Sequence, residues 1–227
     1  MTRRIAFFDV DETLLAEKGM LSFWHFWSRR LAEQGRPPAT SRTSGADRET
    51  LNRAYFTLFA GVPLVYLEDA ARQWYEDYRG GREAYLPETV NALLWHRASG
   101  HEVVLVTGSG TALVRPVAED FGAHHVLATE QFTDAAGVLT GQVRQPMIGA
   151  AKRTAVTGLM RRLGARARDC FAYADHSSDL PMLCAVGQPV VVGDDPVLTA
   201  RAAVLGWRLI DARKGAHPTG AQVMQTT

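Results

Sequence analysis

The chain has 227 residues, 46% of them hydrophobic and 22% charged, so it can bury the core of one α/β domain that carries a smaller insertion. Its formal net charge of +1 argues against a broad electrostatic attraction to nucleic acid or to an acidic membrane surface. Because no apolar run reaches the length of a signal peptide core or a transmembrane span, we expect a cytoplasmic protein. We expect it to be either a monomer or a homodimer.

Residues 5–8 form a short apolar run that is typical of a strand buried on both faces of a parallel sheet. Asp9 and Asp11 follow it, and an i, i+2 pair on an extended segment points to one side. Two carboxylates this close repel each other unless a cation lies between them, which predicts a hard divalent ion such as Mg2+. The alternative is a polar turn in which Asp11 or Thr13 caps a helix.

Residues 18–85 read as a separate helical unit. Apolar residues recur there at helical spacing in about three segments, and a polar, proline-containing loop at residues 35–45 separates the first two. Most of the Trp and Tyr residues lie in this unit. They either form the core of a small helical bundle or line a pocket for a bulky, apolar substrate.

After Pro87 the sequence alternates between strand and helix patterns. We expect strands near residues 102–107, 126–127, 170–174, 189–192 and 207–210, one arm of a hairpin at 138–143, and helices at 87–98, 111–121, 149–163, 180–185 and 196–205. This alternation predicts a doubly wound parallel sheet with helices on both faces. The core would comprise residues 1–17 and 86–213, the cap residues 18–85, and a loose tail residues 214–227. Cys170 and Cys184 lack CxxC spacing and are expected to be buried, reduced thiols.

In such a fold the ligand site lies at the carboxyl ends of the strands. Thr107 and Gly108 follow the expected second core strand, Asp175 follows the strand at 170–174, and Asp179 comes one turn later. Lys152 stands near the start of the helix after the hairpin. Each residue alone could be a cap or a solvated charge. Together they place acids, a hydroxyl, a backbone turn and a cation at one edge of one sheet.

In order and spacing, four stretches resemble the motifs of the haloacid dehalogenase-like hydrolase superfamily. They are residues 9–13, residues 106–109, Lys152 within residues 149–152, and residues 175–179. The insertion resembles the helical cap of the phosphoserine phosphatase-like branch. Glu12 departs from the pattern, since a glycine is common there. The resemblance implies a Rossmann-like core and a phosphatase.

Carried over to this sequence, the resemblance implies that Asp9 is the nucleophile that forms an aspartyl-phosphate, and that Asp11 is the general acid and base. Mg2+ would be held by the Asp9 carboxylate, the Asp11 carbonyl and the Asp175 carboxylate, with Asp179 orienting these ligands. The resemblance also implies the contacts to the phosphate. Thr107 and the amide of Gly108 would bind the phosphoryl oxygens, and Lys152 would offset their charge.

The substrate implied is a small organic phosphate. Phosphoserine is disfavoured, because Lys18 stands where this branch uses a Glu to read the amino acid, although Arg48 or Arg53 could meet a carboxylate. His176, beside the metal acid, is expected to face solvent. Two other functions stay open: a phosphotransferase or mutase that uses the same intermediate, and a catalytically silent binding protein with the same fold.

Overall fold

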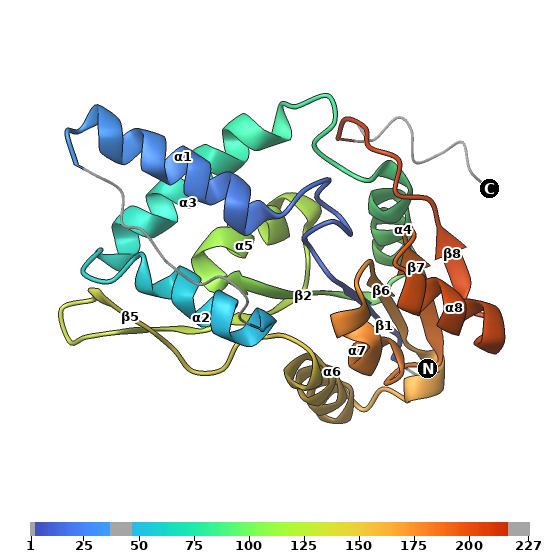
Figure 1. The fold of residues 1–227 in the computed structure, drawn as a ribbon. Helices are drawn as coiled ribbons and strands as arrows, with labels where there is room; N and C mark the ends of the chain where they lie inside the picture. Colours follow the sequence, from blue (N-terminus) through green and yellow to red (C-terminus); the bar gives the residue numbers. More distant parts are fainter. Residues whose placement is uncertain (1–2, 37–46, 218–227) are drawn as a thin grey trace.

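The computed structural model describes residues 3–36 and 47–217, and this part of the chain contains a sheet of six parallel strands (Figure 1). Their order is β3-β2-β1-β6-β7-β8, so the first strand lies in the centre. The strands are β1 (Ile5–Phe8), β2 (Glu102–Gly110), β3 (His125–Thr129), β6 (Phe171–Ala174), β7 (Gln188–Val192) and β8 (Arg208–Ile210). The predicted doubly wound α/β core is confirmed.

The central strand is buried on both faces, because helices cover both sides of the sheet. Ala6 and Phe8 pack into one core together with α4 (Pro87–Ala98) and α5 (Thr111–Phe121). Ile5 and Phe7 pack into a second core on the opposite face. That face is covered by α6 (Ala150–Leu163), α7 (Leu180–Leu183) and α8 (Pro196–Leu205), with 3-10 turns at Ala167–Asp169 and Ser177–Asp179. The continuous apolar run of β1 is thus explained by burial on two sides.

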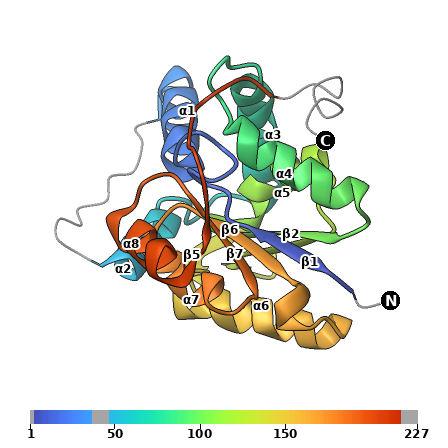
Figure 2. The same ribbon diagram turned by 90° about the vertical axis from the view of Figure 1, so that its right-hand side faces the viewer.

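The insertion between β1 and α4 is helical, as predicted. It contains α1 (Gly19–Glu33), α2 (Arg48–Thr57) and α3 (Leu64–Arg79), and α1 and α3 lie on the side of the sheet opposite α6 (Figure 2). Phe59 is the centre of its core, where it contacts the rings of Phe23, Trp24, Trp27 and Tyr55. Most of the predicted loop at residues 35–45 lies outside the described residues.

A two-stranded hairpin, β4 (Gln131–Thr133) and β5 (Leu139–Val143), extends from the core beneath the cap. Leu139 exchanges backbone hydrogen bonds with Gly61 and Val62 at 2.8 and 2.9 Å. The sequence predicted only the second arm, because β4 is three residues long and largely exposed, and so carries no burial pattern. In space, this part of the core chain supports the cap.

A network of side-chain hydrogen bonds fastens α3 to the core. The Tyr75 hydroxyl donates to Asp120 Oδ2 at 2.7 Å, and Arg79 Nη2 donates to Asp120 Oδ1 at 2.8 Å. Tyr85, in the segment that leads from the cap to α4, donates to the Tyr75 hydroxyl at 3.0 Å. Charge-assisted bonds of this kind hold one end of the cap on α5.

Three local predictions need correction. Cys184 is exposed, because it follows the buried Met182 and Leu183 at the end of α7 and helical geometry turns it outward. The expected turn at residues 108–110 is part of β2, whose pairing with β3 shifts register before Gly110. Gly215 and His217, at the start of the expected loose tail, also pack on the folded chain. Gly215 exchanges two backbone hydrogen bonds with Tyr85, and the His217 ring stacks on Phe121. Residues 218–227 of the predicted tail lie outside the described part.

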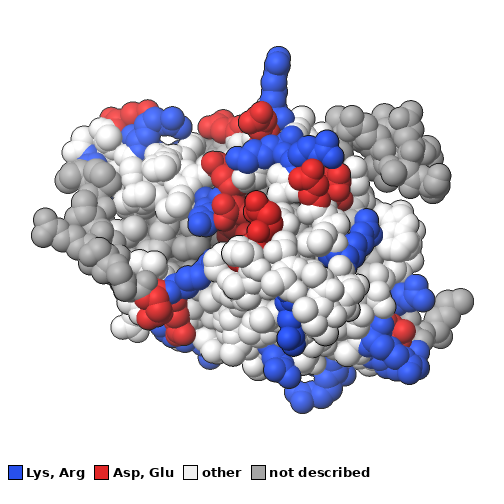
Figure 3. Space-filling view, turned by 45° about the vertical axis from the view of Figure 1, so that its right-hand side comes forward, with Lys and Arg blue, Asp and Glu red and all other residues white. Residues whose placement is uncertain are grey.

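The surface carries both signs of charge. Figure 3 shows acidic and basic side chains interspersed over one face, with uncharged surface between them. This agrees with the near-zero net charge. Within residues 3–36 and 47–217, none of the helices combines the length and apolar character needed to cross a membrane.

Candidate active site

Asp9 follows β1 directly and is held there by a backbone hydrogen bond from its N–H to the Tyr173 carbonyl at 3.0 Å. Lys152, in the first turn of α6, places Nζ 2.6 Å from Asp9 Oδ1 and 2.8 Å from Asp179 Oδ2. All three side chains are buried. A buried charge is costly unless it is paired with an opposite charge. The three buried side chains therefore depend on one another, and Lys152 keeps both carboxylates in place.

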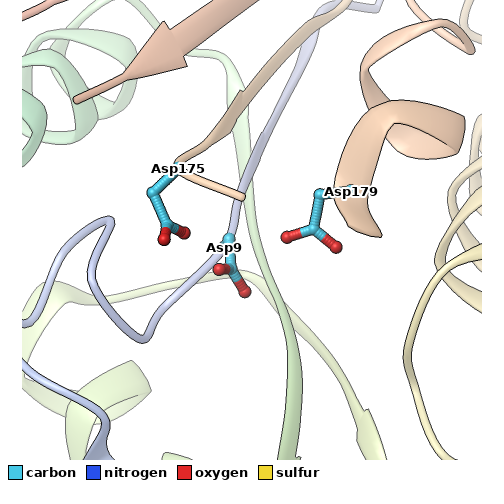
Figure 4. A group of neighbouring side chains, drawn as sticks. All are labelled: Asp9, Asp175 and Asp179. Carbon is cyan, nitrogen blue, oxygen red and sulfur yellow. The ribbon is translucent and has the colours of Figure 1, made fainter. Parts of the chain in front are cut away.

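Asp9, Asp175 and Asp179 form an acidic cluster in which one oxygen from each lies within 4.8 Å of the others. Figure 4 shows the three carboxylates directed toward a common space. The Thr13 hydroxyl fixes Asp175 with a 3.0 Å hydrogen bond, and Asp179 Oδ1 is buried without a hydrogen-bond partner among the described residues. Burial raises the pKa of Asp9 and of Asp175. Three hard oxygen donors, one of them unsatisfied, fit a Mg2+ ion.

The Asp11 carboxylate is held by donors from the cap and from β2. Its Oδ1 accepts from the backbone N–H of Gly19 at 2.7 Å, and its Oδ2 accepts from Ser109 Oγ at 2.9 Å and from Thr107 Oγ1 at 3.4 Å. A Cβ at position 19 would lie 2.8 Å from Asp11 Oδ1, so only glycine allows this approach. Burial raises the pKa of Asp11, while the bonds from Ser109 and Gly19 oppose the rise. The side chain can therefore both give and take a proton.

The turn after Asp11 is strained. Glu12 has φ of 57°, in the left-handed region, where a side chain costs energy and glycine does not. This conformation explains why glycine suits the position. The turn closes through hydrogen bonds from the N–H groups of Leu14 and Leu15 to the Val10 carbonyl, both 2.9 Å.

The Gly108 peptide is clamped from two sides. Its carbonyl accepts from Asn52 Nδ2 of α2 at 2.9 Å and from Thr129 Oγ1 of β3 at 2.8 Å. The next N–H, that of Ser109, donates to Thr107 Oγ1 at 3.0 Å. The cap and the core thus fix this end of β2 together.

A cavity of about 560 Å³ opens above these residues, between the cap and the core. Its floor is formed by the acidic residues, Lys152 and Gly108, and its wall by apolar and aromatic side chains of the cap together with Ile148. Arg48 lines the cavity, whereas Arg53 instead binds Glu49 at 2.9 Å and the Val143 carbonyl at 3.4 Å. His176, expected to face solvent, lines the cavity as well.

The structure brings the residues singled out in the sequence to one place. Those that line the cavity are Asp9, Asp11, Gly108, Lys152, Asp175 and Asp179. Thr107 is fully buried behind them and contacts Asp11. No site role was predicted for Ser109, Gly19 or Asn52. Ser109 lies within the motif at residues 106–109, but the contacts of Gly19 and Asn52 depend on how the cap folds onto the core.

Two known proteins are similar to this chain over most of its length. A probable phosphatase of Mycobacterium tuberculosis is 31% identical over 218 residues, covering 92% of this chain and 75% of the relative. An inhibition of morphological differentiation protein of Streptomyces azureus is 29% identical over 221 residues, covering 93% of this chain and 79% of the relative.

A solved structure of a phospho-aspartyl intermediate analogue of phosphoserine phosphatase shares the fold, with a TM-score of 0.66 and 16% identity, and the match covers 95% of this chain and 96% of that one. The sequence profile of the haloacid dehalogenase-like hydrolases matches residues 6–184. This chain belongs to the haloacid dehalogenase-like hydrolase family.

Proposed function

We propose that the protein is a Mg2+-dependent phosphatase that hydrolyses a small-molecule phosphomonoester through an aspartyl-phosphate on Asp9. The observation that carries the proposal is the pair of carboxylates at the cavity floor with different partners. Asp9 is bound to the Lys152 ammonium, and Asp11 to neutral donors. Different surroundings of this kind suit a nucleophile and an acid-base group. The relative described as a probable phosphatase and the aspartyl-phosphate analogue of the structural neighbour support the same reaction.

In the first step, an oxygen of Asp9 attacks phosphorus while the ester P–O bond breaks, and Asp11 gives its proton to the departing alcohol. In the second step, a water molecule attacks the same phosphorus, and Asp11 takes a proton from it. The bond to Asp9 breaks, and inorganic phosphate leaves. Asp11 thus ends as it began.

The remaining groups would hold the phosphoryl oxygens. The Gly108 amide would donate to them, and Lys152 would offset their charge. The Thr107 hydroxyl would join once its single proton turns from Asp11 to a phosphoryl oxygen. Mg2+ would be held by Asp9, Asp175 and the Asp11 backbone carbonyl, with Asp179 orienting the ligands, and would neutralise negative charge on the transferred group. The unsatisfied Oδ1 of Asp179 is consistent with this assignment.

The cavity favours an ester with a largely apolar body. Its wall combines Met20, Leu21, Trp24, Leu51, Tyr55 and Leu58. Lys18 also lines the cavity, and its Nζ lies 3.5 Å from Glu12 Oε2. A carboxylate at position 18 would be needed to bind the amino group of phosphoserine. We therefore propose a substrate bulkier than phosphoserine.

The test is phosphate release from a panel of phosphomonoesters, with Mg2+ and with EDTA, by the wild type and by Asp9→Asn. The matched control is Asp77→Asn, at an exposed position on α3. We expect release that requires both Mg2+ and Asp9 and is unchanged in the control. Release that persists in Asp9→Asn would refute the covalent mechanism.

A further inference from the structure

Two residues on one face of α2 each keep an unsatisfied polar atom at the cavity. Asn52 and Tyr55 are three positions apart, so their side chains are neighbours on the helix, and both line the cavity. Asn52 Oδ1 and the Tyr55 hydroxyl are buried and have no hydrogen-bond partner among the described residues. A buried polar atom without a partner has lost its hydrogen bonds to water and gained none in return, which is unfavourable. Such a cost is recovered when a ligand supplies the partner.

The orientation of the Asn52 amide is determined by its neighbour. Nδ2 donates to the Gly108 carbonyl at 2.9 Å, and the reversed amide would place two acceptor oxygens against each other. The unsatisfied atom is therefore the amide oxygen, which needs a donor. Because Asn52 is tied to Gly108, this oxygen lies at the phosphate end of the cavity.

Tyr55 lies about one turn further along the same face of α2. Gly108, which Asn52 binds, directly precedes Ser109, the donor to Asp11 Oδ2. Burial, and then the negative charge of Asp11, raise the pKa of Tyr55, so the phenol keeps its proton. In the proposed reaction Asp11 faces the ester oxygen that leaves. The two unsatisfied atoms therefore belong to the part of the cavity that receives the carbon atoms next to the ester, while the apolar wall of the cap lies farther out.

We propose that Asn52 and Tyr55 are specificity residues that bind a hydroxyl or ammonium group on the substrate close to its ester oxygen. The substrate class is then the phosphate esters of vicinal diols or amino alcohols with an apolar remainder. This inference rests on the phosphatase function proposed above. A hydroxyl satisfies both residues, since it donates to Asn52 Oδ1 and accepts from Tyr55, and an ammonium group satisfies Asn52.

The experiment uses four esters that share one skeleton. The first is O-phosphorylated phenylalaninol, which has an ammonium group on the carbon next to the ester carbon. The others carry hydroxyl, methoxy or hydrogen at that carbon. We expect kcat/KM for the hydroxyl or the ammonium ester to exceed that for the hydrogen and methoxy esters by about tenfold or more, because only the first two donate. The ranking of hydroxyl against ammonium identifies which of the two donors the site prefers.

Variants assign the preference to these side chains. In Asn52→Leu the ratio of kcat/KM between donor and hydrogen esters should fall toward one, and in Tyr55→Phe it should fall several-fold for the hydroxyl ester. Asn52→Leu also loses the bond to Gly108, which lowers turnover of all four esters but leaves the ratio as a measure of recognition. The matched control is Tyr66→Phe, on α3 at a position 65% exposed, which should keep the wild-type ratio.

Non-hydrolysable phosphonates of the same four compounds separate the two proposals. Their dissociation constants, measured by calorimetry with Mg2+, report recognition even if no ester is turned over. Donor selectivity that disappears in Asn52→Leu supports the inference whatever the outcome for catalysis. Equal binding of all four compounds, or selectivity that both variants retain, overturns it.

Discussion

The ammonium of Lys152 lies 2.6 Å from Asp9 Oδ1, and the two residues are only 3% and 6% exposed. Replacing the lysine, as in Lys152→Met, leaves Asp9 and Asp179 buried without their cation. We expect kcat to fall by about a hundredfold or more. The free energy of unfolding should fall by about 3–5 kcal/mol, as measured by denaturant titration.

Arg153→Met is the matched control, because Arg153 is the exposed neighbour on the same helix. It should change neither quantity by a measurable amount. A Lys152→Met enzyme that is folded and keeps the wild-type kcat would remove Lys152 from the reaction.

The Ser109 hydroxyl donates to Asp11 Oδ2 at 2.9 Å, and Ser109 is buried while Asp11 is half-buried at the cavity. Ser109→Ala removes this donor but leaves the bond from Gly19. We expect kcat to fall about tenfold with KM nearly unchanged, because Ser109 acts on Asp11 and not on the phosphate. The measurement is steady-state kinetics, with Ser99→Ala, at the exposed end of α4, as the control. A selective rise in KM would mean that Ser109 binds substrate instead.

The positive φ of Glu12 predicts a stabilising substitution. Glu12→Gly should raise the free energy of unfolding by about 1 kcal/mol, since it removes the strain of a side chain in the left-handed region. Its ion pair with Lys18, 3.5 Å long between exposed side chains, contributes little. Glu12→Ala separates the two effects, because it also removes the ion pair but keeps Cβ. Equal stability of the Gly and Ala variants would show that strain is not the cause.

The order of the core strands and helices, and the burial of β1, could be predicted from the sequence because each depends on residues that are adjacent in the chain. The run at β1 is apolar at every position, since both of its faces are covered, and Asp9 and Asp11 follow it directly. Asn52 could not be assigned in this way. Its partner Gly108 is 56 residues away, and the contact exists only once the cap has packed on the core.

The joint contact of two hydroxyl groups in the motif at residues 106–109 with Asp11 was also not predicted from the sequence. Thr107 and Ser109 alternate along β2, so both point to one side of the strand, and both contact Asp11. The sequence predicted a turn from residue 108, because glycines stand at 108 and 110, between the strand and the helix expected there. Glycine at the end of a strand that shifts register gives the same pattern.

The effect of Asp175→Asn on stability should depend on whether Mg2+ is present. Asp175→Asn removes a negative charge beside Asp9 and Asp179, so without metal the variant should be at least as stable as the wild type. With Mg2+ at about a hundred times its dissociation constant, the wild type should gain about 2.7 kcal/mol. The variant should gain much less. Thermal melting with Mg2+ and with EDTA measures both, and an equal Mg2+ gain in the two proteins would place the ion elsewhere.

His96, on α4, is fully buried in a cluster that packs against Phe8 of β1 and Phe171 of β6. Its Nδ1 is 2.7 Å from Nδ1 of His101, and its Nε2 is 3.0 Å from the Tyr173 hydroxyl. Burial first, and then the nearby His101 and Arg208, lower the pKa of His96 to about 3. The imidazole is therefore neutral in the folded protein at neutral pH.

In the unfolded chain His96 should titrate near its ordinary pKa of about 6.5. Between about pH 6.5 and pH 3, His96 is therefore protonated in the unfolded state but neutral in the folded state. The free energy of unfolding consequently decreases as the pH falls through this window. Urea titrations across the window measure the slope. His96→Phe should be less stable at pH 8 but show a shallower slope, whereas His25→Gln, on the exposed face of α1, should keep the wild-type slope. If the slope of His96→Phe equalled that of the wild type, the acid sensitivity would have to arise from other groups.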